Sequence, residues 1–131
     1  MATLEDAERI AIHLPEVTEA SRWGNRTWMV GGKGFAWERP LSKADVKRFG
    51  SETPPAGPLL AVRVADLEEK EIVLHGRGEA FFTIAHFSGY PAVLIQLSKV
   101  QPRALKEAIV DAWLACAPPA LAQEYLGAHE H

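Results

Sequence analysis

Residues 26–39 read RTWMVGGKGFAWER, and this stretch decides the fold. Two short runs of β-prone residues flank Gly31–Gly34, where the glycines supply the positive φ angles that a tight hairpin turn needs. A turn made of the two central residues, or of all four, predicts the same register, with Val30 opposite Phe35. The stretch therefore predicts two antiparallel strands joined by a glycine turn.

The predicted register also assigns the side chains to faces. Trp28 is expected opposite Trp37 and Arg26 opposite Arg39, all on one face, because side chains alternate along a strand. The tryptophans admit two interpretations: a stacking platform for single-stranded nucleic acid, or the buried face of the sheet beneath the helices, which we favour. The opposed arginines repel unless they are solvated or bridged by an anion, so we expect a basic rim there, near Arg22.

The rest of the chain supplies helices around further strands. Capping boxes begin helices after Thr3 and Ser42, and Pro102 fits the first turn of a long helix. The predicted order is a helix to about residue 13, strands over 17–23 and the hairpin, a helix over 43–49, a strand over 59–64, a helix over 66–75, strands over 80–85 and 92–97, a helix over 102–117, a short turn over 120–126 and a disordered tail after about 126. This order predicts an α+β two-layer sandwich, with an antiparallel sheet of about five to six strands and helices packed on one face.

Composition indicates an ordinary globular protein. The 131 residues are 47% hydrophobic and 24% charged, which predicts one domain over residues 1–131. No apolar run approaches the roughly 20 residues of a membrane span, and the first residues lack the basic start of a secretory signal. Cys116 is the one cysteine, so neither an internal disulfide nor a zinc site is expected. We expect a cytoplasmic monomer or homodimer with no metal, no cofactor and no membrane partner.

Charge is unevenly distributed along the chain. The net charge is −3, yet residues 20–50 hold seven basic and two acidic residues, so this segment carries +5 and the remainder −8. The segment is either a solvated basic surface or a phosphate-binding one. The candidate nucleic-acid contacts are Arg22, Arg26, Lys33 and Arg39. Lys33 lies at the hairpin tip, which lacks the spacing and the following helix of a nucleotide phosphate loop but can act as a wing against a nucleic-acid backbone.

Residues 81–97, FFTIAHFSGYPAVLIQL, contain the second candidate site. Two apolar strands flank HFSGYP, where Gly89 and Pro91 suit a tight turn for backbone reasons alone. We expect His86 to be a structural or rim residue. A small-molecule site formed by His86 and Tyr90 is the alternative, and it requires a concave pocket. No nucleophile motif is present, so no catalytic residue is predicted and we expect a protein that is not an enzyme.

Three separated segments together resemble the MmcQ/YjbR family of small bacterial proteins. They are SRWGNRTWMVGGKGFAWE, FFTIAHFSGYPAVLIQL and DAWLACAPPALAQEYL, and the resemblance covers nearly the whole chain. It implies a compact α+β fold similar to that of CyaY or of secretion chaperones. It also implies DNA binding through hairpin wings, with no settled catalytic residues. The rival hypothesis is a protein-interaction or chaperone-like adaptor that uses an exposed sheet face or edge.

Overall fold

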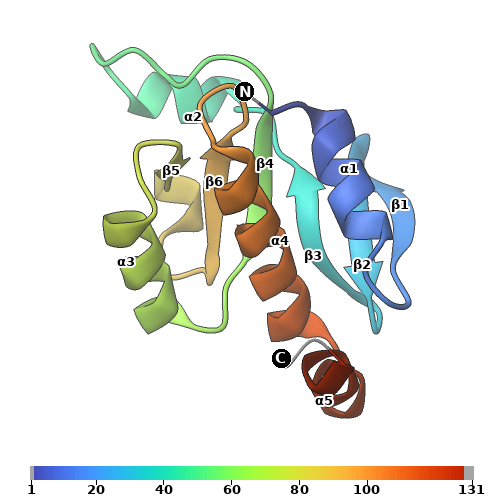
Figure 1. The fold of residues 1–131 in the computed structure, drawn as a ribbon. Helices are drawn as coiled ribbons and strands as arrows, with labels where there is room; N and C mark the ends of the chain where they lie inside the picture. Colours follow the sequence, from blue (N-terminus) through green and yellow to red (C-terminus); the bar gives the residue numbers. More distant parts are fainter. Residues whose placement is uncertain (1, 129–131) are drawn as a thin grey trace.

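A computed structural model describes residues 2–128 as a sheet with helices on both of its sides (Figure 1). The elements are α1 (Leu4–Ile12), β1 (Thr18–Arg22), β2 (Asn25–Val30), β3 (Lys33–Glu38), α2 (Lys43–Arg48), β4 (Leu59–Arg63), α3 (Leu67–Gly76), β5 (Phe81–Phe82), the 3₁₀ turn η1 (Ala85–Phe87), β6 (Ala92–Gln96), α4 (Pro102–Cys116) and α5 (Pro119–Ala128).

The six strands form one antiparallel sheet in the order β1-β2-β3-β4-β6-β5. Helices α1 and α4 cross one face of this sheet (Figure 1), and the main hydrophobic core lies between them and the strands. Trp28 of β2 and Trp113 of α4 are fully buried in this core, where the Trp113 indole donates a hydrogen bond to the Pro15 carbonyl (3.1 Å). The predicted α+β class, with an antiparallel sheet and helices packed against it, is confirmed, although η1 and the residues that flank α2 also pack on the other face.

A smaller apolar cluster covers part of the other face. Ala61 of β4 and Leu94 of β6 contribute to it, together with Phe87 of η1. Leu41 and Phe49, which flank α2, pack against the cluster from outside. This second layer lies over β4 and β6, so the neighbouring surface of β2 and β3 can form a hollow beside it.

The predicted register of the β2–β3 hairpin is wrong. The turn is centred on Gly31 and Gly32, whose φ angles are +57° and +79°, and Val30 therefore pairs with Lys33 rather than with Phe35. Both glycines take the left-handed conformation that a two-residue hairpin turn requires, so Lys33 is free to begin the strand. Phe35 then forms a bulge, because Trp28 pairs with Ala36 while Met29 pairs with Gly34.

The corrected register places Trp28 and Trp37, which were predicted to be opposite each other, on different faces of the sheet. Thr27, not Trp28, is opposite Trp37. Trp28 is buried under the helices, as we favoured, while the partly exposed Trp37 packs against the cluster on the other face. The shared tryptophan platform and the opposed pair Arg26 and Arg39 therefore do not form.

Residues 80–87 and 119–128 differ from their predicted secondary structure. β5 contains two residues instead of six, and η1 follows it before the loop to β6. Residues 119–128 form a helix where a short turn and a disordered tail were expected, because Tyr125 packs on Trp113 with ring centroids 5.0 Å apart. Residues 129–131 of the predicted tail lie outside the described residues. Among the described helices, none has the length and apolar character of a membrane span.

Candidate functional site

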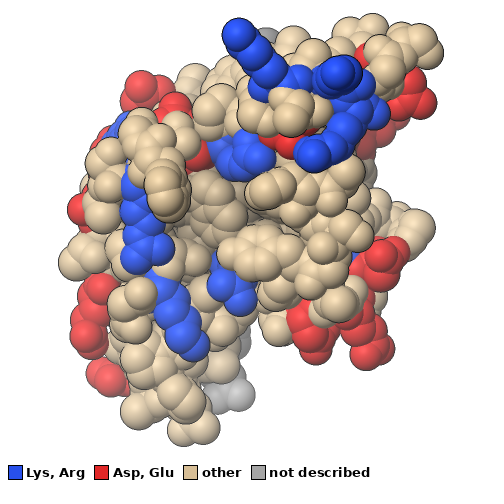
Figure 2. Space-filling view, turned by 180° about the vertical axis from the view of Figure 1, so that it is seen from behind, with Lys and Arg blue, Asp and Glu red and all other residues tan. Residues whose placement is uncertain are grey.

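A hollow of about 910 Å³ lies beside the second apolar cluster. We call it the basic hollow and define it by Arg22, Lys33, Trp37, Arg39, Arg63 and Tyr90. Its wall comes from the β1–β2 turn, the β2–β3 hairpin, β4 and the loop that contains η1. Figure 2 shows the side of the molecule away from the viewer in Figure 1, where blue side chains gather around a hollowed tan centre.

The basic hollow has no carboxylate among its lining residues. Of its four cationic side chains, Arg39 forms an ion pair with Asp45, at 3.0 Å. Within the part of the chain that the structure describes, Arg22, Lys33 and Arg63 form no ion pair with an acidic side chain. Three positive charges therefore remain without a carboxylate partner around one concavity.

A glycine keeps the floor of the basic hollow open. A Cβ atom on Gly34 would lie 3.1 Å from the Thr27 methyl carbon and 3.8 Å from Nη1 of Arg22. The Arg22 guanidinium thus reaches from β1 across β2 toward β3, beside the start of the strand that carries Lys33. An alanine at this position would crowd the Thr27 methyl group, while its Cβ would meet the arginine at ordinary contact distance.

Aromatic rings form the opposite wall. The Trp37 ring lies 6.4 Å from both Phe87 and Tyr90 between centroids, and Phe87 meets Tyr90 edge-on at 5.6 Å. Arg63 stacks over Tyr90 (5.3 Å) while its Nε donates to the Pro91 carbonyl (3.3 Å). Partly exposed aromatic faces beside guanidinium groups can receive both the flat and the anionic part of a ligand.

Lys70 of α3 fixes the loop that carries these rings. Its ammonium donates to the carbonyl oxygens of Phe87 (2.6 Å) and Tyr90 (2.8 Å), and the residue is only 5% exposed. Burial lowers the pKa of Lys70 below its usual range. A buried cation without a carboxylate partner is costly, so these two hydrogen bonds are what make its position tenable.

A buried carboxylate fixes the segment between β3 and α2. Asp45 accepts hydrogen bonds from the Ser42 backbone amide (2.9 Å) and from Arg39 (3.0 Å). Burial alone would raise the pKa of Asp45, but the Ser42 hydrogen bonds and the Arg39 guanidinium outweigh it and hold that pKa below its ordinary value. Arg39 is therefore engaged within the protein, although it lines the basic hollow.

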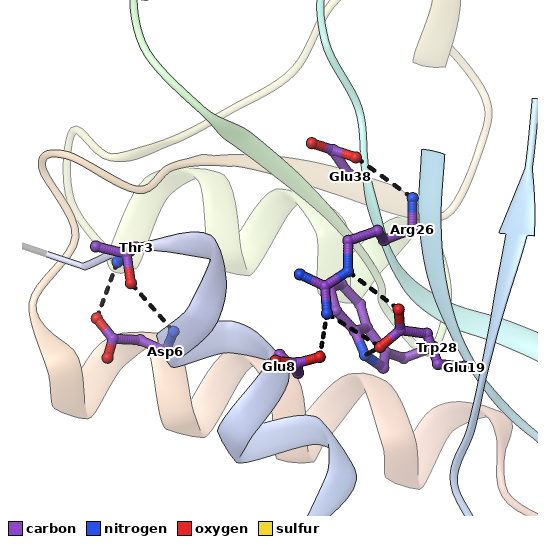
Figure 3. Close-up of polar contacts among 7 residues, drawn as sticks. All are labelled: Thr3, Asp6, Glu8, Glu19, Arg26, Trp28 and Glu38. Atoms are coloured by element: carbon purple, nitrogen blue, oxygen red, sulfur yellow. Dashed lines mark hydrogen bonds and ion pairs between the residues drawn. The ribbon is translucent and has the colours of Figure 1, made fainter. Parts of the chain in front are cut away.

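Arg26 lies on the helix-covered face and has carboxylate partners (Figure 3). Its guanidinium forms ion pairs with Glu8 of α1 and Glu19 of β1, and Glu19 also accepts from the Trp28 indole at 3.1 Å. The hydrogen bond with Glu19 raises the pKa of Arg26, and the same bond lowers the pKa of Glu19. Arg26 thus ties α1 to the sheet and is not part of the basic hollow.

The structure unites two candidate sets that the sequence kept apart. Arg22, Lys33 and Arg39 line the same hollow as His86 and Tyr90, whereas Arg26 does not. Sequence reasoning missed Arg63 and Trp23, which also line the hollow. An arginine inside the apolar run LLAVRV was the available signal for Arg63, and the RWGN turn was the signal for Trp23.

The described residues offer little nucleophilic or metal chemistry. No group of three or more metal-ligating side chains occurs among residues 2–128. Cys116 is buried on α4, and burial raises the pKa of its thiol, which keeps it protonated and unreactive at neutral pH. The arrangement is suited to binding an anion with a flat apolar part.

Comparison with known proteins identifies relatives over almost the full chain. The uncharacterized proteins Mb2600 of Mycobacterium bovis and Rv2570 of Mycobacterium tuberculosis are each 43% identical to it over 129 residues, covering 96% of this chain and 97% of theirs. No solved structure matches it at a significant level. The YjbR family model matches residues 12–115, which include every residue that defines the basic hollow. The chain belongs to the YjbR family.

Proposed function

We propose that this chain is a cytoplasmic, non-enzymatic DNA-binding protein, and that the basic hollow and its rim contact the phosphates. The observation that carries the proposal is the grouping of Arg22, Lys33 and Arg63 without carboxylate partners in a chain whose net charge is −3. In an acidic protein, a concavity whose charged lining residues are all cations concentrates positive potential at one place. Phosphate oxygens are a natural counter-charge for guanidinium groups in such a site.

Each of the two hairpin turns has a cation beside it. Arg22 precedes the β1–β2 turn, and Lys33 follows the β2–β3 turn at the opposite end of β2. Lys43 of α2 directly follows Ser42, which lines the hollow, and Lys47 lies one helical turn further on. Both lysines are exposed and extend the basic rim. A strand of nucleic acid lying across the hollow could contact both regions.

A salt titration tests the proposal. A labelled duplex and a labelled single strand are titrated with protein at several salt concentrations. If three cations each neutralise one duplex phosphate, the slope of log K against log salt is about −2.7, and affinity falls about 40-fold between roughly 50 and 200 mM salt. Binding that is absent at low salt would refute the proposal.

A double variant locates the contacts. Arg22→Ala with Lys33→Ala removes two exposed cations from the basic hollow and should flatten the slope by about 1.8. The matched control is Arg103→Ala with Lys106→Ala, which removes two exposed charges from α4. An equal loss in both double variants would show that net charge, rather than the hollow, determines binding.

A small anionic ligand is the second candidate function, because the site is concave. The volume of about 910 Å³ lies within the range of small-molecule sites, and the Tyr90 loop forms one wall of it. This alternative predicts that a free aromatic anion raises the melting temperature while DNA of either form does not.

A further inference from the structure

We propose that the basic hollow holds an unpaired nucleotide of a single strand, so that the chain binds single-stranded nucleic acid in preference to duplex. This inference rests on the proposed function and specifies its ligand. It depends on three observations: an exposed tryptophan at the edge of the hollow, an aromatic wall inside it, and cations without carboxylate partners that line the same hollow.

Trp23 is the first observation. Its side chain is 98% exposed, and it occupies the β1–β2 turn with Gly24 at the edge of the basic hollow. Its φ angle is +56°, a left-handed conformation that large side chains rarely adopt. The fold thus presents a strained residue and a large apolar ring that contributes no core contact. Backbone strain together with an exposed aromatic ring is a recurrent property of binding sites.

The aromatic wall is the second observation. Trp37 is partly exposed and Tyr90 is 39% exposed, and both line the hollow. Their planes are inclined by 60°, so a base cannot lie flat against both rings, and stacking takes place on one ring face at a time. Because Arg63 stacks over the Tyr90 ring, the Trp37 ring is the better platform for a base.

The cations are the third observation. Arg22 and Lys33 lie on the strands that flank β2, beside its opposite ends, and both line the hollow that Trp23 and Trp37 line. A chain that lays bases on these rings carries its phosphates past those cations. Aromatic faces beside a positively charged groove are the usual arrangement in proteins that bind single strands.

The shape of the site separates single strands from duplex. In a duplex the bases are stacked on one another, so their faces cannot reach a ring inside a hollow. A duplex can contact only the rim cations, whereas a single strand can contact the rim and also stack on Trp23 and Trp37. We therefore expect the single strand to bind about tenfold more tightly or better, the effect of one stacked base.

Fluorescence anisotropy with three probes tests the inference. They are a labelled single-stranded oligonucleotide of about ten nucleotides, a duplex of the same length, and free adenosine monophosphate as a competitor. The inference predicts that the single strand binds about tenfold more tightly than the duplex and that the mononucleotide competes only weakly. If the mononucleotide binds as tightly as the strand, the hollow recognises a free nucleotide, and the inference that its ligand is a single strand is wrong.

Variants of Trp23 separate binding from folding. Trp23→Ala should weaken single-strand binding about tenfold and leave duplex binding nearly unchanged, and Trp23→Phe should restore most of the loss. Trp23→Gly should weaken single-strand binding by the same factor as Trp23→Ala. Its melting temperature should be unchanged or higher, since glycine accepts the left-handed conformation. The matched control is Leu67→Ala, which removes an exposed apolar side chain from the start of α3.

The outcomes distinguish this inference from the proposed function. If single strand and duplex bind equally and Trp23→Ala changes neither affinity, the inference is wrong while DNA binding stands. If neither probe binds at low salt, both are wrong. If Trp23→Gly lowers the melting temperature as well as the affinity, the tryptophan has a structural role and the inference is also overturned.

Discussion

Replacing Lys70 with methionine should destabilise the protein and loosen the loop wall of the basic hollow. Methionine has a similar length and fits a buried position, but it cannot donate to the carbonyl groups of Phe87 and Tyr90. The substitution therefore tests whether the buried ammonium holds the loop in place.

The size of the effect can be worked out from the contacts. A hydrogen bond to a charged group contributes about 1.5–3 kcal/mol, so two bonds set an upper limit of about 6 kcal/mol. Each carbonyl keeps another partner, however: the Phe87 oxygen also accepts from the Tyr90 amide, and the Tyr90 oxygen accepts from the Ala92 amide. Removing the buried charge also returns part of its desolvation cost. We therefore expect a loss of about 2 kcal/mol, which lowers the melting temperature of a domain of this size by about 7 °C.

The change of the free energy of unfolding with pH gives a second test of the role of Lys70. Burial lowers the pKa of Lys70 in the folded state, so between that pKa and the ordinary value of 10.5 the unfolded chain holds one more proton than the folded chain. The free energy of unfolding of the wild type then rises with pH across that window. The Lys70→Met variant lacks this rise, so the stability gap between wild type and variant widens as pH increases toward 10.5.

Urea unfolding at neutral and at alkaline pH measures both effects, and amide hydrogen exchange in residues 87–92 measures the loop. The control is Lys106→Met, which changes an exposed lysine of α4 and should alter stability little. A Lys70→Met variant as stable as the wild type at neutral pH, with unchanged exchange in the loop, would refute the reasoning. It would mean that the cost of burying the ammonium equals everything its two hydrogen bonds contribute.

Three further predictions follow from buried or strained positions. Asp45→Asn should lower the free energy of unfolding at neutral pH by about 1–3 kcal/mol. The wild type loses the stability that ionised Asp45 contributes as pH falls through its lowered pKa, and the variant should not show this loss. Urea unfolding between acid and neutral pH checks both. Gly31→Ala should cost about 1–2 kcal/mol by thermal unfolding, and more than Gly32→Ala, because both glycines have positive φ but only at Gly31 would a Cβ meet the Pro118 ring, at 3.1 Å. Equal losses in the two glycine variants would exclude the Pro118 contact as a cause. Cys116 should react with iodoacetamide only when urea unfolds the chain, since burial raises its pKa and covers it; rapid labelling of the folded protein would contradict this.

Local signals in the sequence determined most of the fold. The capping boxes at Thr3 and Ser42 form as predicted, with each cap side chain accepting from the amide three residues later. Pro102 begins α4, and the order of the elements and the α+β class are confirmed. These features depend on a few neighbouring residues, which is why a single sequence contains enough information to predict them.

The register of the central hairpin could not be predicted in this way. Gly31, Gly32 and Gly34 all tolerate positive φ, so the sequence does not say which pair forms the turn. Position 31 also lies close to Pro118, since a Cβ on Gly31 would be 3.1 Å from its ring, and this neighbour is far away in the chain. The helix over 119–128 was missed for a similar reason, since its apolar residues need Trp113 and the core as a partner.

The candidate site was predicted as two unconnected halves. Charge points to the basic residues, and a position between two apolar runs points to the loop residues. Only the sheet order places Arg22 and Tyr90 around one hollow, since β2, β3 and β4 lie between β1 and β6. Arg26 was included because it belongs to the same basic segment. Its neutralisation by Glu8 and Glu19 depends on α1 crossing the sheet, which no local pattern reveals.

The bulge at Phe35 shifts the alternation of inward and outward side chains along β3 by one residue. On either side of the inserted residue, odd and even positions exchange their surroundings, so that Phe35 and Ala36 are both buried on the helix side while Trp37 faces outward. A homologue whose strand has the same number of residues but no bulge would turn the side chain that aligns with Trp37 toward the helices. Position-by-position alignment across this strand therefore does not compare equivalent environments, and the phase of the strand has to be established before any aligned aromatic residue is assigned to the hollow.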